Sequence, residues 1–190
     1  MNSTTTPQQP SEARDQTIVV VGGGTAGWMS AATLRRRLGC KVILVESAND
    51  QGVGVGEATI PAMIDWLGNM GIDEDDFLRE TQGTFKLAIR FDNWVTPEHR
   101  YWHPFGVCGG QIDGLDLIHH LKRGIDEGWI SGDVPYTQFS LQRQFCEQHT
   151  SPRRDVTLPS ELGNYAYHLD AGKLAQFIRC LLYTSDAADE

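Results

Sequence analysis

The sequence has little of what marks a metal site or a nucleic-acid partner. Its 4 cysteines are widely spaced without a CxxC pair, which excludes the usual zinc pattern and indicates free thiols in a reducing compartment. The adjacent His119 and His120 would point to different faces of a helix, so we expect no metal. The formal net charge of -9 at pH 7 argues against nucleic acid, because phosphate contacts need clustered Lys and Arg.

Long apolar runs are also missing. No stretch approaches the roughly 20 apolar residues of a membrane-spanning helix. Residues 1–15 lack the apolar core of a secretory signal and are rich in Thr, Gln, Pro and Ser, which predicts a disordered leader. We therefore expect a cytoplasmic protein without a membrane partner, and its 190 residues, 40% hydrophobic, predict a globular domain with a sizeable core.

What the sequence does contain begins with a β-α-β pattern. The apolar segment Ile18–Val21 predicts a short buried strand, and a helix is predicted from about Ala26 to Leu38, where Gly39 ends it. The segment Lys41–Glu46 predicts a second buried strand. Apolar strands on both sides of one helix are typical of a parallel α/β sheet.

The turn between the first strand and the helix carries a GxGxxG motif at Gly22, Gly24 and Gly27. We predict a tight turn at Gly22, room for a pyrophosphate at Gly24 and close helix–strand packing at Gly27. The helix N-terminus would meet the phosphates with unpaired N–H groups. Glu46, 19 residues after Gly27, can accept from a ribose hydroxyl. These features together predict a dinucleotide site that would suit NAD or FAD.

The remaining elements follow from local signals. Asn49–Thr59 predicts a long loop, and Asp73 with Asp76 predicts a capped start for a helix that runs to Glu80. A strand is predicted at Tyr165–Leu169, and Asp170 would open the helix that follows it. Further helices are predicted at residues 61–70, 115–127 and 137–148.

The stretch Gly83–Trp94, GTFKLAIRFDNW, alternates as one amphipathic strand. Phe85 and Leu87 would lie on the apolar face, with Lys86 and Arg90 on the polar face. Pattern alone favours Lys86 as an ordinary solvent-facing lysine and leaves open that its amine is aimed at a ligand. The following YWHPFG predicts a loop.

The last eleven residues, Cys180–Glu190, differ from what precedes them. They are predicted to interrupt the final helix after Arg179, and they match the in-frame translation of a common sequencing-library adapter. We therefore expect residues 180–190 to be a scar and the natural chain to continue past Arg179, with a natural polar tail as the alternative.

Five ordered motifs carry a family resemblance: GGGTAGW, VGEATIP, TFKLAIRFDNW, YWHPFG and YAYHLDAGKLAQFIR. Together they resemble flavin-dependent tryptophan halogenases from about Ile18 to Arg179. The resemblance implies an α/β, Rossmann-like FAD-binding flavoprotein monooxygenase fold, incomplete at the C-terminus. Residues 16–179 would then be the N-terminal part of a discontinuous FAD-binding domain with substrate-site insertions.

The resemblance also implies site residues. Lys86 matches the essential catalytic lysine of the family, and His103 and Phe105 match residues that line the substrate pocket. Residues 54–61 match a segment that lies over the flavin. The implied FAD-binding residues are Gly22, Gly24, Thr25, Ala26, Gly27, Glu46, Gly56, Ala58 and Thr59.

The implied reaction uses FADH2 from a separate flavin reductase, together with O2 and chloride or bromide, to form hypohalous acid. The acid would halogenate a small electron-rich aromatic such as tryptophan or indole. The family's WxWxIP signature and the acidic residue that works with the lysine do not occur here, so we expect this chain alone to be inactive. The alternatives are an FAD-dependent aromatic hydroxylase, which would not need the lysine, and an inactive nucleotide-binding fragment.

Overall fold

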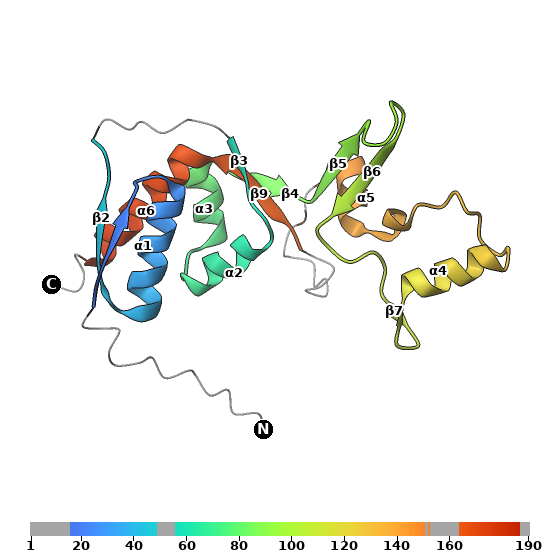
Figure 1. The fold of residues 1–190 in the computed structure, drawn as a ribbon, viewed down its shortest axis with the longest axis horizontal. Helices are drawn as coiled ribbons and strands as arrows, with labels where there is room; N and C mark the ends of the chain where they lie inside the picture. The colour runs from blue at the N-terminus through green and yellow to red at the C-terminus, as the bar shows by residue number, and fades with distance from the viewer. Residues whose placement is uncertain (1–15, 49–55, 151, 153–163, 187–190) are drawn as a thin grey trace, which may run out of the picture. The chain divides into compact units, whose positions relative to one another are not determined.

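The computed structural model describes residues 16–48, 56–150, 152 and 164–186, so the predicted leader and most of the loop Asn49–Thr59 lie outside the described residues (Figure 1). The chain forms two compact units. Unit 1 contains the chain up to Glu57, Trp66–Gly83 and the part from Leu169 onward, and unit 2 contains Ala58–Asp65 and Thr84–His168.

Unit 1 begins with the predicted β-α-β arrangement, drawn in blue and cyan in Figure 1. Strand β1 (Thr17–Val21) and strand β2 (Lys41–Val45) pair in parallel, from Thr17 opposite Lys41 to Val21 opposite Val45. Helix α1 (Thr25–Leu38) connects them. Gly39 ends α1 in the left-handed conformation at φ 65° and donates its N–H to the carbonyl of Arg35, a common C-terminal cap.

The two strands are less buried than predicted. Val19 is 55% exposed, Val21 81%, Ile43 42% and Val45 49%, whereas the residues between them are half-buried. A parallel pair needs cover on both faces to bury every side chain. Here α1 packs on the pair, and the alternate face stays open in the part of the chain that the structure describes. The expectation of fully buried strands is therefore wrong for this chain.

Two further helices complete the core of unit 1. The Asp73 carboxylate accepts from the backbone N–H groups of Asp75 and Asp76 at 2.9 and 3.1 Å, so the predicted cap is confirmed and helix α3 (Glu74–Thr81) follows it. Phe77 is fully buried and meets Phe177 of helix α6 (Ala171–Asp186) edge to face, with centroids 6.1 Å apart.

Helix α6 was predicted to end after Arg179, and this prediction is wrong, because the helix continues to Asp186. The first turn opens as expected, because the Asp170 side chain accepts from the N–H of Lys173 at 2.9 Å. Leu181 and Leu182 are good helix formers, and the Tyr183 ring lies 6.4 Å from that of Trp28 on α1. The adapter origin of residues 180–190 remains a prediction.

In unit 2, the stretch expected as one strand is divided in two. Strand β4 (Thr84–Lys86) pairs antiparallel with β9 (Ala166–Asp170), in a sheet of order β3-β9-β4 that includes β3 (Gly56–Ala58). Strand β5 (Ala88–Asp92) pairs instead with β6 (Arg100–Pro104). The chain changes partners at Leu87, which is buried, and this change of partner interrupts the ladder.

The segment YWHPFG is not a loop, because its first four residues form most of β6. Strand β6 pairs with β5 from Ala88 opposite Pro104 to Asp92 opposite Arg100. Phe91 stacks on Tyr101 with centroids 4.8 Å apart, a cross-strand aromatic pair that stabilises the hairpin.

Helices are present within residues 61–70 and 115–127, as predicted, whereas the short strands at residues 111–112 and 115–116 were not predicted, and β3 lies within the segment Asn49–Thr59 that was expected to be a loop. The helix expected at 137–148 is divided at Ser140, whose hydroxyl accepts from the N–H of Arg143 and caps α5. No helix among the described residues is long and apolar enough to cross a membrane. The remaining elements are α2 (Ala62–Asn69), β7 (Gln111–Ile112), β8 (Leu115–Asp116), α4 (Leu117–Asp126), the 3-10 helix η2 (Tyr136–Phe139) and α5 (Leu141–Glu147).

Candidate functional site

The glycine turn after β1 has the geometry of a phosphate cradle. Gly22 has φ +123°, which residues with a side chain rarely adopt. A Cβ on Gly27 would overlap the carbonyl oxygen of Gly22, so α1 approaches the turn as closely as a glycine allows. By contrast, a Cβ on Gly24, the N-cap of α1, would meet nothing within 4 Å. The open space in front of a helix N-terminus fits a pyrophosphate.

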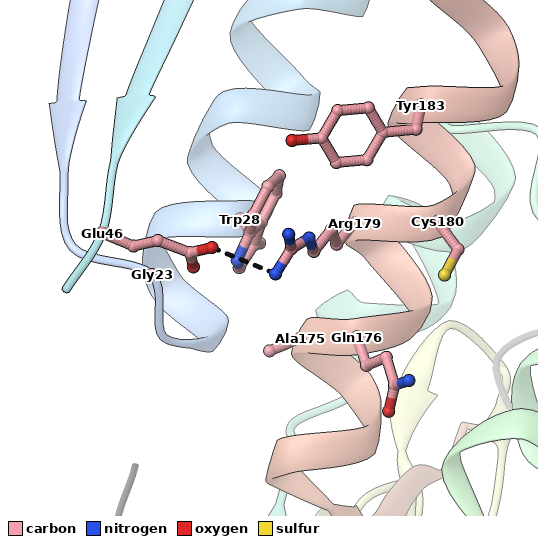
Figure 2. Close-up of a pocket in the computed structure, with 8 residues that line it drawn as sticks. All are labelled: Gly23, Trp28, Glu46, Ala175, Gln176, Arg179, Cys180 and Tyr183. Atoms are coloured by element: carbon pink, nitrogen blue, oxygen red, sulfur yellow. Dashed lines mark hydrogen bonds and ion pairs between the residues drawn. The ribbon is translucent and has the colours of Figure 1, made fainter. Parts of the chain in front are cut away.

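A cavity of about 530 Å³ lies beside this turn in unit 1 (Figure 2). Its size falls in the range of small-molecule sites. Figure 2 shows Glu46, directly after β2, pointing toward Arg179 of α6, and their Oε1 and Nη1 atoms are 3.1 Å apart. The Arg179 guanidinium also lies 5.7 Å from the Trp28 ring centre. The lining residues are Gly23, Trp28, Glu46, Ala175, Gln176, Arg179, Cys180 and Tyr183.

The Glu46–Arg179 ion pair was not foreseen, because nothing in the sequence links positions 133 residues apart. Both side chains are partly exposed, so the pair contributes little stability. The carboxylate that the sequence assigns to a ribose therefore already has a cationic neighbour. Of the other predicted FAD-binding residues of α1, Thr25 donates its hydroxyl to the carbonyl of Ala171 at 3.3 Å, and Ala26 is exposed.

In unit 2, Lys86 is half-buried, and its Nζ atom contacts a backbone carbonyl and an aromatic ring. It donates to the carbonyl oxygen of Thr59 at 3.4 Å, and it lies 5.1 Å from the ring centre of Phe105. An ammonium over an aromatic face at this distance is attracted by the ring quadrupole. Among the residues that the structure describes, Lys86 forms no ion pair with a carboxylate.

His103 and Phe105 extend the same group. The N–H of Phe105 donates to the carbonyl of Leu87 at 3.0 Å, which holds Phe105 next to the residue after Lys86. The rings of His103 and Phe105 are 6.5 Å apart and nearly perpendicular at 88°. His103 is exposed and Phe105 is half-buried. The structure thus brings together the three residues predicted for catalysis and substrate binding.

Thr59 is fixed to strand β9 by its neighbour Tyr167. The N–H of Thr59 donates to the carbonyl of Tyr167 at 2.8 Å, and the N–H of Tyr167 donates to the Thr59 hydroxyl at 2.9 Å. Gly56 and Ala58, the other residues predicted from this segment, begin and end β3. Residues 54 and 55 lie outside the described part of the chain.

His168 lies on the same face of the β4–β9 pair as Lys86, and it was not predicted as a site residue. It pairs with Thr84, and Lys86 pairs with Ala166 two residues along β9, so Lys86 and His168 are diagonal neighbours on one face. Partial burial lowers the pKa of His168 below its ordinary value of 6.5, and the positive charge of Lys86 lowers it further. The alternation of YAYHL gives the face of His168 within its own strand, but not the partner strand.

We expect Lys86→Met to raise the pKa of His168, because the substitution removes a positive charge and leaves the burial in place. Because the pKa of His168 is lower in the folded chain than in the unfolded chain, the unfolded chain binds more protons at this residue as the pH falls below about 6.5. The free energy of unfolding should therefore decrease as the pH falls through this range, and it should decrease less steeply in Lys86→Met. Imidazole NMR titration of the two proteins measures the difference. An unchanged pKa would show that the Lys86 charge is not near His168.

Arg90, expected on the face of Lys86, lies in the other sheet and has its own partners. Its Nε is 3.0 Å from an Asp92 carboxylate oxygen, and its guanidinium lies 5.5 Å from the Trp102 ring centre. Arg90 is therefore an exposed, engaged residue of the hairpin rather than a free neighbour of Lys86.

Comparison with known proteins agrees with this arrangement. A family model described as tryptophan halogenase matches residues 17–185. A tryptophan 6-halogenase of Streptomyces albogriseolus is 32% identical over 93% of this chain and 36% of its own. Solved flavin-dependent halogenases from Brevundimonas sp. BAL3 and Xanthomonas campestris are each 37% identical and superpose with TM-scores of 0.73 and 0.74.

The two structural matches cover 88% and 87% of this chain and 33% of each halogenase. The chain therefore spans about a third of the length of the relatives it matches. The α/β fold of a Rossmann-like FAD-binding protein, expected from the sequence, is confirmed by these neighbours.

Proposed function

The chain belongs to the tryptophan halogenase family, and we propose that the protein it represents is an FAD-dependent halogenase that acts on a small electron-rich aromatic such as tryptophan or indole. One observation carries the proposal: Lys86 is held between the Thr59 carbonyl and the face of Phe105, with His103 beside that ring. An amine fixed on a strand against an aromatic wall suits the delivery of an electrophile to a ring.

The residues of the glycine turn would hold FAD, with the pyrophosphate at the open space of Gly24 and a ribose near Glu46. Reduced FAD, when bound, would supply two electrons and two protons, which together with one proton from solvent convert O2 and a halide ion into hypohalous acid and water. A separate flavin reductase would provide the FADH2. The cytoplasmic location expected from the sequence is part of this proposal.

Lys86 would then carry the halogen to the substrate. Its ammonium can hydrogen-bond to the oxygen of hypohalous acid and transfer its proton there as the aromatic carbon attacks the halogen, so that water leaves, and the neutral amine then takes up the proton that the ring carbon loses. Alternatively, the neutral amine takes the halogen from hypohalous acid and releases water, and the resulting haloamine passes the halogen to the ring carbon while the nitrogen regains the proton that this carbon loses. Both routes give a halogenated arene and water.

Phe105 and His103 would orient the aromatic substrate. Phe105 is anchored through its backbone to Leu87, so its ring has a fixed place relative to Lys86. An aromatic substrate stacked on or against this ring would present its edge to the lysine. The exposed His103 imidazole can donate to or accept from polar groups of the substrate.

Halide dependence tests the proposed function. We call the protein encoded by the reading frame extended past Arg179 the extended protein. Supplied with a flavin reductase and O2, it should give halogenated indole or tryptophan only when chloride or bromide is present. The measurement is product mass by mass spectrometry, with halide-free buffer as the control. Oxygen insertion without halide would identify an aromatic hydroxylase instead.

A further inference from the structure

We propose that Thr59, which the sequence assigns to the cofactor, is a positioning residue that holds the Lys86 amine in place. The inference rests on the proposed function for its catalytic consequence, but its structural part concerns unit 2 alone. It gives a defined task to a residue of the VGEATIP motif that is half-buried and whose hydroxyl accepts from the N–H of Tyr167 on β9.

The first step is the contact itself. Lysine side chains have four rotatable bonds, so an amine that must meet one reactive oxidant needs an acceptor to fix it. Among the described residues, the acceptor within hydrogen-bond distance of the Lys86 Nζ is the Thr59 carbonyl, at 3.4 Å. Phe105 limits the amine from a second side, at 5.1 Å from its ring centre.

The second step is what fixes that carbonyl. Thr59 is bound to Tyr167 by its N–H at 2.8 Å and by its hydroxyl at 2.9 Å. Tyr167 is fully buried on β9 and lies directly opposite Phe85 of β4, next to Lys86. The strand that carries Lys86 and the residue that receives its amine are thus both fixed to the same buried position of β9.

The third step is why the hydroxyl matters. The Thr59 hydroxyl oxygen accepts from the backbone N–H of Tyr167. Valine has nearly the same shape as threonine but carries no oxygen, so it cannot accept this hydrogen bond. Thr59→Val would leave the Tyr167 N–H without this acceptor and would loosen the Thr59 backbone. The carbonyl would then no longer restrict Lys86. Thr59→Ser keeps the oxygen and should keep the position.

His168 reports the position of the Lys86 charge and gives a test that does not depend on catalysis. In the 190-residue chain, NMR titration should show a higher His168 pKa in Thr59→Val, rising a substantial part of the way toward that in Lys86→Met. Thr59→Ser should titrate as the wild type does. Thr96→Val, a threonine of the β5–β6 turn, is the matched control and should leave the His168 pKa unchanged.

The structural part is overturned if Thr59→Val titrates as the wild type does, or if Thr59→Ser shifts as much as Thr59→Val. It is also overturned if Lys86→Met leaves the His168 pKa unchanged, since the geometry would then be wrong. Amide hydrogen exchange adds a second measure: the Tyr167 N–H should exchange roughly fivefold to tenfold faster in Thr59→Val, as expected for one lost hydrogen bond.

The catalytic part is tested in the extended protein. Thr59→Val should lower halogenated product per flavin oxidised by roughly tenfold or more, because a small misplacement of a reacting group is costly. Free hypohalous acid should rise in solution, measured with a chlorination-sensitive dye. If product per flavin is unchanged, Thr59 does not position Lys86 during turnover. Lack of product in the wild type would instead reject the proposed function and leave the NMR result to decide the structural part.

Discussion

Lys86→Ala in the extended protein is expected to abolish halogenated product while the oxidation of FADH2 by O2 continues. The loss should be at least roughly 100-fold, the usual scale for removal of a group that takes part in proton transfer or covalent chemistry. Flavin oxidation should persist because the lysine is proposed to act after hypohalous acid has formed. Product by mass spectrometry and flavin oxidation by absorbance, recorded in the same reaction, measure both quantities.

Two variants make this result specific. Lys86→Arg should remain inactive, because a guanidinium stays protonated and its planar fork does not match the place of an ammonium over Phe105. Arg90→Ala removes an exposed basic residue four positions away that is engaged with Asp92 and Trp102, so it should retain most of the activity. The melting temperature should change little in Lys86→Ala, since the lost cation–π contact contributes about 1 kcal/mol. Substantial halogenation by Lys86→Ala would return this residue to an ordinary strand lysine.

The β-α-β unit was predictable because its signals are local. Glycine spacing, an apolar segment on each side and a glycine stop at position 39 determine β1, α1 and β2 within one or two residues. The Asp73 cap of α3 was predictable for the same reason, since its acceptor and donors lie within three residues. The pattern could not predict whether other elements pack on both faces of the strands. Apolar strands are expected to be buried, whereas Val21 and Val45 are exposed here.

The division of Gly83–Trp94 into β4 and β5 was not predictable, because both halves keep the same two-residue period. The alternation continues through Leu87 while the pairing partner changes from β9 to β6. The pairing partners lie 80 to 84 positions away for β4 and 8 to 16 positions away for β5. A pattern within one strand carries no information on either.

The Lys86 group shows the same limit. The family resemblance selected Lys86, His103 and Phe105, and the structure places them together. Thr59 was predicted as a cofactor residue and not as a neighbour of Lys86. Its contact with Lys86 is made by its backbone carbonyl, which every residue type has, so the sequence carries no signal for it. His168 was missed because only the β4–β9 register puts it beside Lys86.

The glycine turn gives the second large effect, because two of its glycines should fail in different ways. In the 190-residue chain, Gly27→Ala should destabilise unit 1 by about 3 kcal/mol or more, since the new Cβ would overlap the carbonyl oxygen of Gly22, a backbone atom that cannot rotate away. Urea unfolding measures this cost. A midpoint equal to that of the wild type would show that α1 is not packed so closely against the turn.

Gly24→Val should spare the fold and weaken FAD. A Cβ at position 24 meets nothing within 4 Å, and the extended backbone there, at φ -77° and ψ -179°, suits a β-branched residue. The change should therefore cost the fold at most about 1 kcal/mol as a poorer N-cap. The side chain would fill the space proposed for the pyrophosphate, so FAD affinity of the extended protein, measured by flavin fluorescence, should fall at least roughly tenfold. Unchanged affinity in Gly24→Val would mean that the glycine segment before α1 is only a turn and not a phosphate site. Weakened FAD binding with an unchanged unfolding midpoint would instead show that Gly24 is needed for the cofactor, whereas Gly27 is needed for the fold.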